Sequence, residues 1–264
     1  MFNPPWVRWR QRHIWRDHRI DDVLWRRVVD SLALFDRLTP RQLRRLHERA
    51  SLFIHDKELD PVQGARIDER FKVSVAAQAC LPILQLGVGW YRHWSSIIVY
   101  PDKFVAPHHA IDTSGVHHEW EEALSGQAWE RGPVVLSMAD VEASGHGDGF
   151  NVVIHEMAHK LDMLADGPNG CPPLHRNMDR AAWHRELGAA YEDLNRCLDR
   201  GMSTSLDGYA ATSPGEFFAV CSETFFERPY ELRSAYPGVY QQLARFYRQD
   251  PLDTDVVASG NTTA

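Results

Sequence analysis

The segment NVVIHEMAHKLDML, residues 151–164, places two histidines four positions apart with a glutamate directly after the first. On an α-helix, His155 and His159 lie about 40° apart around the axis and one turn along it, so both imidazoles can reach one ion. Glu156 lies about 100° away, where its carboxylate can reach a water on that ion without binding the ion. This H-E-x-x-H pattern supplies two metal ligands and a general base. Two packed histidines on an ordinary buried helix are the alternative.

A catalytic zinc site normally has three protein ligands and leaves one position for water. The metzincin pattern continues along the same helix, and it is excluded because Asp162 and Ala165 occupy its glycine and third-ligand positions. The third ligand must therefore come from a later part of the chain. Acidic and histidine side chains there are the candidates, namely Glu216, Glu223, His175, His184 and Asp207.

Spacing alone leaves the roles of several polar side chains open. Glu216 lies early in an expected helix, where it could bind a metal or simply complement the helix N-terminus. Asp162 could fix a ligand histidine through its second nitrogen, or it could be a structural carboxylate, and Glu223 is another candidate for such support. Tyr209 could donate a hydrogen bond to an oxyanion or pack in the core. His175 is expected to be a surface or packing residue, as is His184.

The remaining patterns predict a mainly helical α+β protein with a small mixed sheet ahead of the motif helix. The run TPRQLRRLHERASLF begins with Thr39 as N-cap and Pro40 in the first turn. Helices are expected at residues 21–36, 39–53, 70–81, 180–200, 214–227 and 236–249. Strands are expected in the β-branched runs SSIIVYP and PVVLSM, at 95–101 and 133–138.

One domain is expected over residues 1–252, with a basic helical segment at 1–60, a catalytic core at 70–250 and a flexible tail at 253–264. The PVVLS run is either a sheet edge that pairs with an extended peptide or an internal strand. Paired histidines at 108–109 and 117–118 are expected in solvated loops that could cover the site, rather than at a second metal.

Composition excludes other classes of protein. Hydrophobic residues make up 44% of the 264 residues, which is enough for a packed core and argues against a disordered chain. The four cysteines form no C-x-x-C pair, so free thiols in a reducing compartment are expected. The first twenty residues contain no apolar run typical of a secretory signal, and glutamine, proline and glycine interrupt the uncharged segment 74–90. A cytoplasmic protein without a membrane span is therefore expected.

Residues 1–50 carry 12 Lys and Arg against 6 Asp and Glu, whereas the whole chain has a net charge of −7. Such a basic segment could contact nucleic acid. Its arginines alternate with Val, Leu and Phe at helical spacing, which favours the solvated faces of amphipathic helices. No direct nucleic-acid partner is therefore expected.

Four segments resemble the Mlc titration factor A family of peptidases: GPVVLS at 132–137, NVVIHEMAHKLDM at 151–163, YAATSPGEFFAVCSETFF at 209–226 and QDP at 249–251. The resemblance covers most of the chain. It implies a zincin-like metallopeptidase fold whose catalytic core is similar to the protease domain of anthrax lethal factor. It also implies one zinc ion per chain, with ligands and catalytic groups at five positions. These are His155, His159 and Glu216 as zinc ligands, Glu156 as general base and Tyr209 as stabiliser of the tetrahedral intermediate.

The resemblance further implies a cytoplasmic peptidase with aminopeptidase-like activity on small artificial substrates. It implies binding of the repressor Mlc as well, which relieves repression of glucose phosphotransferase genes. A regulatory protein that sequesters this repressor is therefore the alternative function. Two departures matter: Val220 stands where thermolysin-like enzymes carry an acid, and the sequence lacks the G-x-M-E-N motif of many zinc aminopeptidases.

Overall fold

The computed structural model describes residues 5–102, 104–111, 117–124, 126–128, 132–165 and 167–253, so the expected tail lies outside it from residue 254 onward. Helices supply most of these residues. The α-helices are α1 (Pro5–Asp17), α2 (Asp22–Val29), α3 (Pro40–Asp56), α4 (Glu69–Cys80), α5 (Met138–Ala143), α6 (Val152–Asp162), α7 (Arg180–Asp199), α8 (Pro214–Glu227), α9 (Pro229–Ala235) and α10 (Pro237–Tyr247). The 3-10 turns are η1 (Ala33–Phe35), η2 (Val88–Tyr91) and η3 (Gly208–Ala211).

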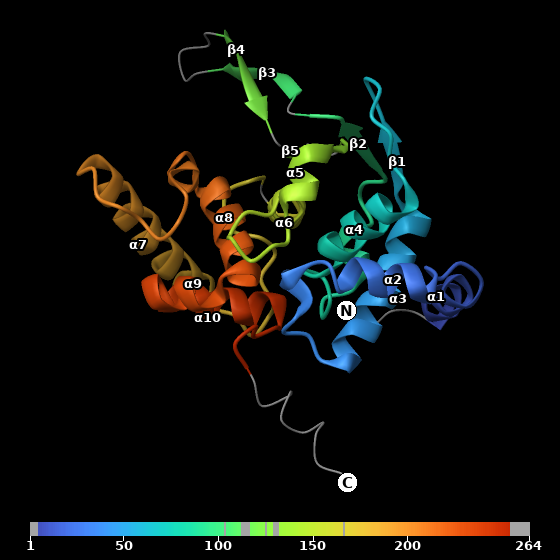
Figure 1. The fold of residues 1–264 in the computed structure, drawn as a ribbon. Coiled ribbons are helices and arrows are strands. Elements are labelled where there is room, and N and C mark those ends of the chain that lie inside the picture. The colour runs from blue at the N-terminus through green and yellow to red at the C-terminus, as the bar shows by residue number, and fades with distance from the viewer. Residues whose placement is uncertain are drawn as a thin grey trace.

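A four-stranded sheet precedes the motif helix in the chain, as the sequence predicts. The strands are β1 (Glu58–Pro61), β2 (Ser96–Tyr100), β3 (Phe104–Ile111), β4 (His117–Leu124), β5 (Gly126–Ala128) and β6 (Val134–Ser137). The sheet has the order β1-β2-β6-β5, in which β1, β2 and β6 are parallel and β5 is antiparallel to β6. The PVVLS run is thus an internal strand, and the short β5 is the edge beside it. Strands β3 and β4 form a separate antiparallel pair that projects from the body of the protein (Figure 1).

One apolar core extends from Ile20 near the start of the chain to Tyr247 at the end of α10. Helix α6 lies near its centre, with the N-terminal helices on one side and α7 to α10 on the other (Figure 1). Internal strands of a parallel sheet are covered on both faces and therefore need a continuous apolar run. The run in β6 meets this need, since Val134 and Leu136 are fully buried and Val135 is 5% exposed. The central place of α6 means that its polar side chains are desolvated.

Two of the expected helices are shorter than predicted. The helix predicted over 21–36 is wrong in extent, because α2 ends at Val29 and a turn follows, in which Ser31 Oγ donates a 2.7 Å hydrogen bond to Val28 O. The helix predicted over 236–249 begins only at Pro237 and ends at Tyr247, before Arg248 in the left-handed conformation. A separate helix, α9, precedes it, and Tyr236 between them has φ −135° and ψ 72°, outside the helical region that a following proline disfavours.

The loop prediction for the paired histidines at 108–109 and 117–118 is wrong. These residues belong to β3 and β4, which pair without a break from Phe104–Leu124 to Ile111–His117. Strands β1 and β5 and helix α5 were also not predicted from the sequence. Each has six residues or fewer, too few for a hydrophobic period to be recognised.

The uncharged segment 74–90 is core structure, as predicted. It comprises most of α4 and the turn that follows, and Val75, Ile83 and Leu84 within it are fully buried. Among the described residues, none of the helices combines the length and the apolar character that crossing a membrane requires. The four cysteines are free thiols.

The start of α3 gives a test of the fold. Thr39 Oγ1 accepts a hydrogen bond from Gln42 N, and Gln42 Oε1 accepts one of 2.8 Å from Thr39 N, which is a complete capping box. We expect Thr39→Ala to lower the free energy of unfolding by about 1 kcal/mol, measured by urea denaturation. Thr39→Ser keeps the hydroxyl and should retain most of the stability. Equal losses in the two variants would contradict the role of the cap.

Candidate metal centre

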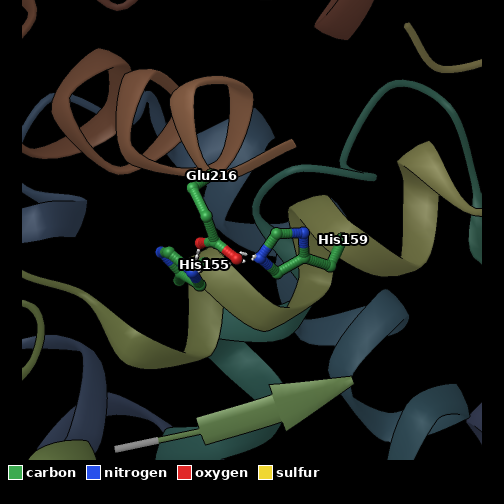
Figure 2. Close-up of side chains that lie close together, drawn as sticks. All are labelled: His155, His159 and Glu216. Carbon is green, nitrogen blue, oxygen red and sulfur yellow. Dashed lines mark hydrogen bonds and ion pairs between the residues drawn. The ribbon is translucent and has the colours of Figure 1, made fainter. Parts of the chain in front are cut away.

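Helix α6 carries the H-E-x-x-H pattern, and Asn151 fixes where it begins. Asn151 Oδ1 accepts a 2.9 Å hydrogen bond from Ile154 N and so satisfies one donor of the first turn. Several apolar side chains of the helix are fully buried, namely Val153, Ile154, Met157, Ala158 and Leu161. This packing fixes the rotation of α6, which presents His155 and His159 to α8 (Figure 2).

Three potential ligand atoms converge between α6 and α8 (Figure 2). Nε2 of His155 lies 2.9 Å from Oε2 of Glu216, and Nε2 of His159 lies 3.2 Å from the same oxygen. The two Nε2 atoms are 3.1 Å apart. Each side chain therefore directs one atom at the same small space, and the three residues together could hold a metal ion.

Glu216 reaches this space because of where α8 begins. Ser213 is the N-cap, and its Oγ accepts a 3.1 Å hydrogen bond from Glu216 N. Pro214 occupies the first helical position, where the missing N–H costs nothing. Glu216 therefore lies in the first turn of α8, and its carboxylate extends across to α6.

Glu223 contacts the cluster from one side without belonging to it. This residue follows Glu216 by seven positions, on nearly the same face of α8, and its Oε1 lies 2.7 Å from Nδ1 of His155. Because an ionised carboxylate can only accept a hydrogen bond, Nδ1 of His155 carries a hydrogen in this contact, and Nε2 is the ring nitrogen that faces the cluster. The other carboxylate oxygen accepts a 2.6 Å hydrogen bond from Asn151 N. Glu223 thus fixes both the imidazole and the start of α6.

A buried polar network behind Glu223 was missed in the sequence. Asn151 Nδ2 donates to Gln78 Oε1 and to Glu227 Oε1, each at 2.8 Å. Glu227 Oε2 accepts a 2.7 Å hydrogen bond from Gly147 N. Two local signals could have found part of it: an asparagine before an apolar run is a typical N-cap, and Glu227 follows Glu223 by one helical turn.

The close carboxylates govern the charge of the histidine pair. Burial disfavours the imidazolium of His155, but the charge of Glu223 and the hydrogen bonds with Glu216 and Glu223 outweigh burial and hold the pKa of His155 well above its usual value. For Glu216 burial acts to raise the pKa, yet the hydrogen bonds with His155 and His159 outweigh it and lower the pKa far below the usual value. The cluster therefore favours a positive charge at its centre, supplied either by a proton or by a cation.

Glu156 lies next to the cluster on α6 but is not part of it. Its side chain is buried, and among the described residues Oε2 has no hydrogen-bond partner. Burial raises the pKa of its carboxyl to about 7, against an opposing effect of the two histidines. A carboxyl with a pKa near neutrality can both take up and release a proton at physiological pH.

The structure shows where Asp162 and Tyr209 lie, whereas spacing in the sequence left their roles open. Asp162 is fully buried at the end of α6, where its Oδ2 accepts a 2.7 Å hydrogen bond from Gly170 N, so it supports the following loop rather than a histidine. Burial raises the pKa of its carboxyl to about 6. Tyr209, in η3, is 40% exposed, so core packing does not explain it. Its ring centroid lies 6.1 Å from that of His155, at the edge of the cluster.

The other candidates lie elsewhere. Nε2 of His175 is 2.8 Å from Phe246 O, His184 is exposed on α7, and Asp207 caps η3 through Tyr209 N at 2.8 Å. A cavity of about 190 Å³ lies between the turn before α3 and the segment after α10, and the residues that line it are not those of the cluster. The arrangement of ligand atoms, rather than this cavity, therefore marks the candidate site.

Comparison with known proteins places the chain among metallopeptidases. The sequence profile of the family described as "Glucose-regulated metallo-peptidase M90" matches residues 6–248. Similar proteins include three that carry the name Mlc titration factor A. The one from Serratia proteamaculans is 39% identical over 243 residues, which cover 90% of this chain and 92% of that protein. The one from Salmonella arizonae is 37% identical over 235 residues, 87% of this chain and 92% of the relative. The one from Yersinia pestis is 38% identical over 231 residues, which cover 86% of this chain and 85% of that protein.

Burial of Glu156 predicts how the stability of the metal-free protein depends on pH. A glutamate in the unfolded chain has a pKa of 4.5, whereas the folded protein keeps this carboxyl protonated up to about pH 7. The neutral carboxyl thus contributes fully to the free energy of unfolding below the pKa of the unfolded chain. This contribution is lost as the pH rises through the pKa of the folded protein. Over this window the wild type should lose on the order of 3 kcal/mol of unfolding free energy relative to Glu156→Gln, which cannot ionise. Urea denaturation of both proteins in the presence of a chelator measures this, and parallel pH profiles would contradict it.

Proposed function

The chain belongs to the glucose-regulated metallopeptidase family M90, and from this premise we propose that it is a zinc-dependent peptidase whose zinc ligands are His155, His159 and Glu216. The observation that carries the proposal is the convergence of two imidazole nitrogens and one carboxylate oxygen from two helices. Two histidines and one glutamate form a known donor set of catalytic zinc, which leaves a fourth position for water.

The geometry of the three atoms fits a single zinc ion. For zinc bonds of about 2.0–2.1 Å in a tetrahedral site, neighbouring ligand atoms lie about 3.3 Å apart. The separations in the cluster, from 2.9 to 3.2 Å, require only small movements to reach this value. The contact between Nδ1 of His155 and Glu223 also fits, since a carboxylate on the second nitrogen is a common partner of a ligand histidine.

The chemistry follows from the side chains around this point. Zinc, when bound, supplies Lewis acidity that makes a water more acidic and polarises a substrate carbonyl. Glu156 is the general base: its carboxylate takes the proton of the attacking water and returns it to the leaving amine, as its pKa of about 7 permits. Tyr209 donates a hydrogen bond from its hydroxyl to the oxygen that becomes negative during attack.

The sheet supplies a place for an extended substrate. Strand β5 packs against α6 and pairs with β6 along one edge, and its other edge has no strand partner among the described residues. A peptide that adds to this edge would lie beside α6, the helix that carries His155 and His159. We therefore assign substrate binding to β5 rather than to the internal PVVLS run. Aminopeptidase-like activity and a cytoplasmic location are parts of the same proposal.

A second function is favoured by the names of the relatives. A protein 39% identical to this chain is called Mlc titration factor A, and this name indicates binding of Mlc. We propose that this chain also binds a repressor of the Mlc type and thereby affects glucose phosphotransferase genes. The two functions are compatible. The alternative assigns the main role to binding of the repressor and a secondary role to peptidase activity.

Metal content tests the zinc site directly. Purified wild type should contain close to one zinc per chain by elemental analysis, and Glu216→Ala should lose most of it because one of three ligands is gone. Glu192→Ala is the matched control, since this glutamate lies on α7 with a side chain that is 74% exposed. Zinc retained in Glu216→Ala would remove Glu216 from the ligand set, and zinc-free wild type after resupply would overturn the enzyme proposal.

Glu156→Gln separates catalysis from binding. The amide keeps the shape of the side chain but cannot take a proton, so kcat on a peptide substrate should fall by a factor of about 10²–10⁴ while zinc content stays unchanged. If the two functions are independent, affinity for a Mlc-type repressor should also stay unchanged, measured by isothermal titration calorimetry. Turnover at the wild-type rate would show that Glu156 is not the base.

A further inference from the structure

The loop after α6 and the first turn of α8 touch backbone to backbone. A Cβ atom at Gly170 would lie 2.5 Å from the carbonyl oxygen of Pro214, and one at Gly215 would lie 2.9 Å from the carbonyl oxygen of Pro168. Side-chain carbons do not approach oxygen this closely, so only glycine permits the contact at either position. Two glycines thus allow two backbone segments to lie against each other directly before Glu216.

Gly170 is held in place from two further directions. Its N–H donates to Oδ2 of Asp162 at 2.7 Å, and its carbonyl oxygen accepts a 2.9 Å hydrogen bond from Nε1 of Trp183, which is buried. Its φ of +77° is one that residues with a side chain rarely adopt. Asp162 is itself fully buried at the last position of α6. The loop is therefore fixed to the end of the helix that carries the two histidines.

These contacts form a continuous path from the helix that carries the two histidines to the turn that carries Glu216. It runs from α6 through Asp162 to Gly170, and then by backbone contact to Pro214 and Gly215, the two residues before Glu216. On its own helix Glu216 is fixed by Ser213, through the hydrogen bond of 3.1 Å to its N–H. That cap sets the local conformation of the turn but not its distance from α6.

We propose that Asp162 and Gly170 are positioning residues for Glu216: they set the distance of the first turn of α8 from α6 and so bring the third ligand to the two histidines. This inference rests on the proposed zinc site. It states that the close approach of the two backbone segments raises the affinity for the metal. If the loop served only stability, changes in it would leave the metal affinity of the folded protein unaffected.

The first test is Gly170→Ala, which forces the loop and the first turn of α8 apart. Zinc affinity, measured by competition with a chromophoric chelator, should weaken by about tenfold or more, the size of effect seen for residues that orient metal ligands. Gly188→Ala is the matched control, because nothing lies within 4 Å of a Cβ there among the described residues, and it should bind zinc as the wild type does. Circular dichroism of the metal-free proteins shows whether each variant is folded.

A double-mutant cycle tests whether the effect passes through Glu216. If it does, Gly170→Ala should weaken zinc binding in the wild-type background and have little further effect in Glu216→Ala. Equal factors in the two backgrounds would overturn the proposal. Replacement of zinc by cobalt adds a spectroscopic readout: Gly170→Ala should shift the visible absorption toward that of Glu216→Ala, whereas an unchanged spectrum would contradict a displaced ligand.

Asp162 supplies a conservative rescue. Asp162→Asn keeps an oxygen that can accept from Gly170 N and should retain zinc affinity, whereas Asp162→Ala should lose it to about the same extent as Gly170→Ala. If Gly170→Ala does not fold, this pair decides: equal affinities in the two Asp162 variants overturn the inference. Wild type that binds no zinc would instead overturn the metal centre and this inference with it.

Discussion

The packing of α6 against α8 is the constraint on which the site depends. Two imidazoles of one helix and two carboxylates of the other meet in a space largely removed from water, where an unpaired charge is costly. Each group therefore needs a partner of opposite charge or a hydrogen bond. Glu223 contacts Nδ1 of His155, and Glu216 contacts Nε2 of both histidines. The sheet and the outer helices contribute by fixing where the two helices lie.

Local signals in the sequence were enough to predict much of the helical framework. Thr39 and Pro40 mark the start of α3, and the long amphipathic pattern at 180–200 gives α7 almost to the residue. The same signals fail where an element is short, as in β5, or where a turn interrupts a continuous pattern, as after Val29. For the site, H-E-x-x-H supplied two of the three clustered side chains, because both lie on one helix. Spacing could not choose Glu216, which depends on how α8 docks on α6.

The buried network around Asn151 shows why the remainder escaped prediction. Asn151 Nδ2 bonds to Gln78, 73 residues away, and to Glu227, 76 residues away. The helical spacing of Glu223 and Glu227 places both on one face of α8, but no local pattern indicates that Asn151 and Gln78 are their partners in a network. Their roles follow only from which faces of α4, α6 and α8 are turned toward one another. The glycines with positive φ in the loop before α6 could not be assigned a role from the sequence either. Gly147, for example, donates its N–H to Glu227, and this contact depends on the position of α8.

The carboxylates of α8 also restrict how this helix can change in length. Glu216, Glu223 and Glu227 are spaced seven and four residues apart and form one stripe along the helix. Each member has a fixed partner on α6 or on the loop before it. One residue inserted or deleted inside the stripe would rotate everything beyond it by about 100° and turn at least one buried carboxylate away from its partner. The part of α8 between Glu216 and Glu227 therefore has a fixed length, because changing it by one residue would break at least one of these contacts.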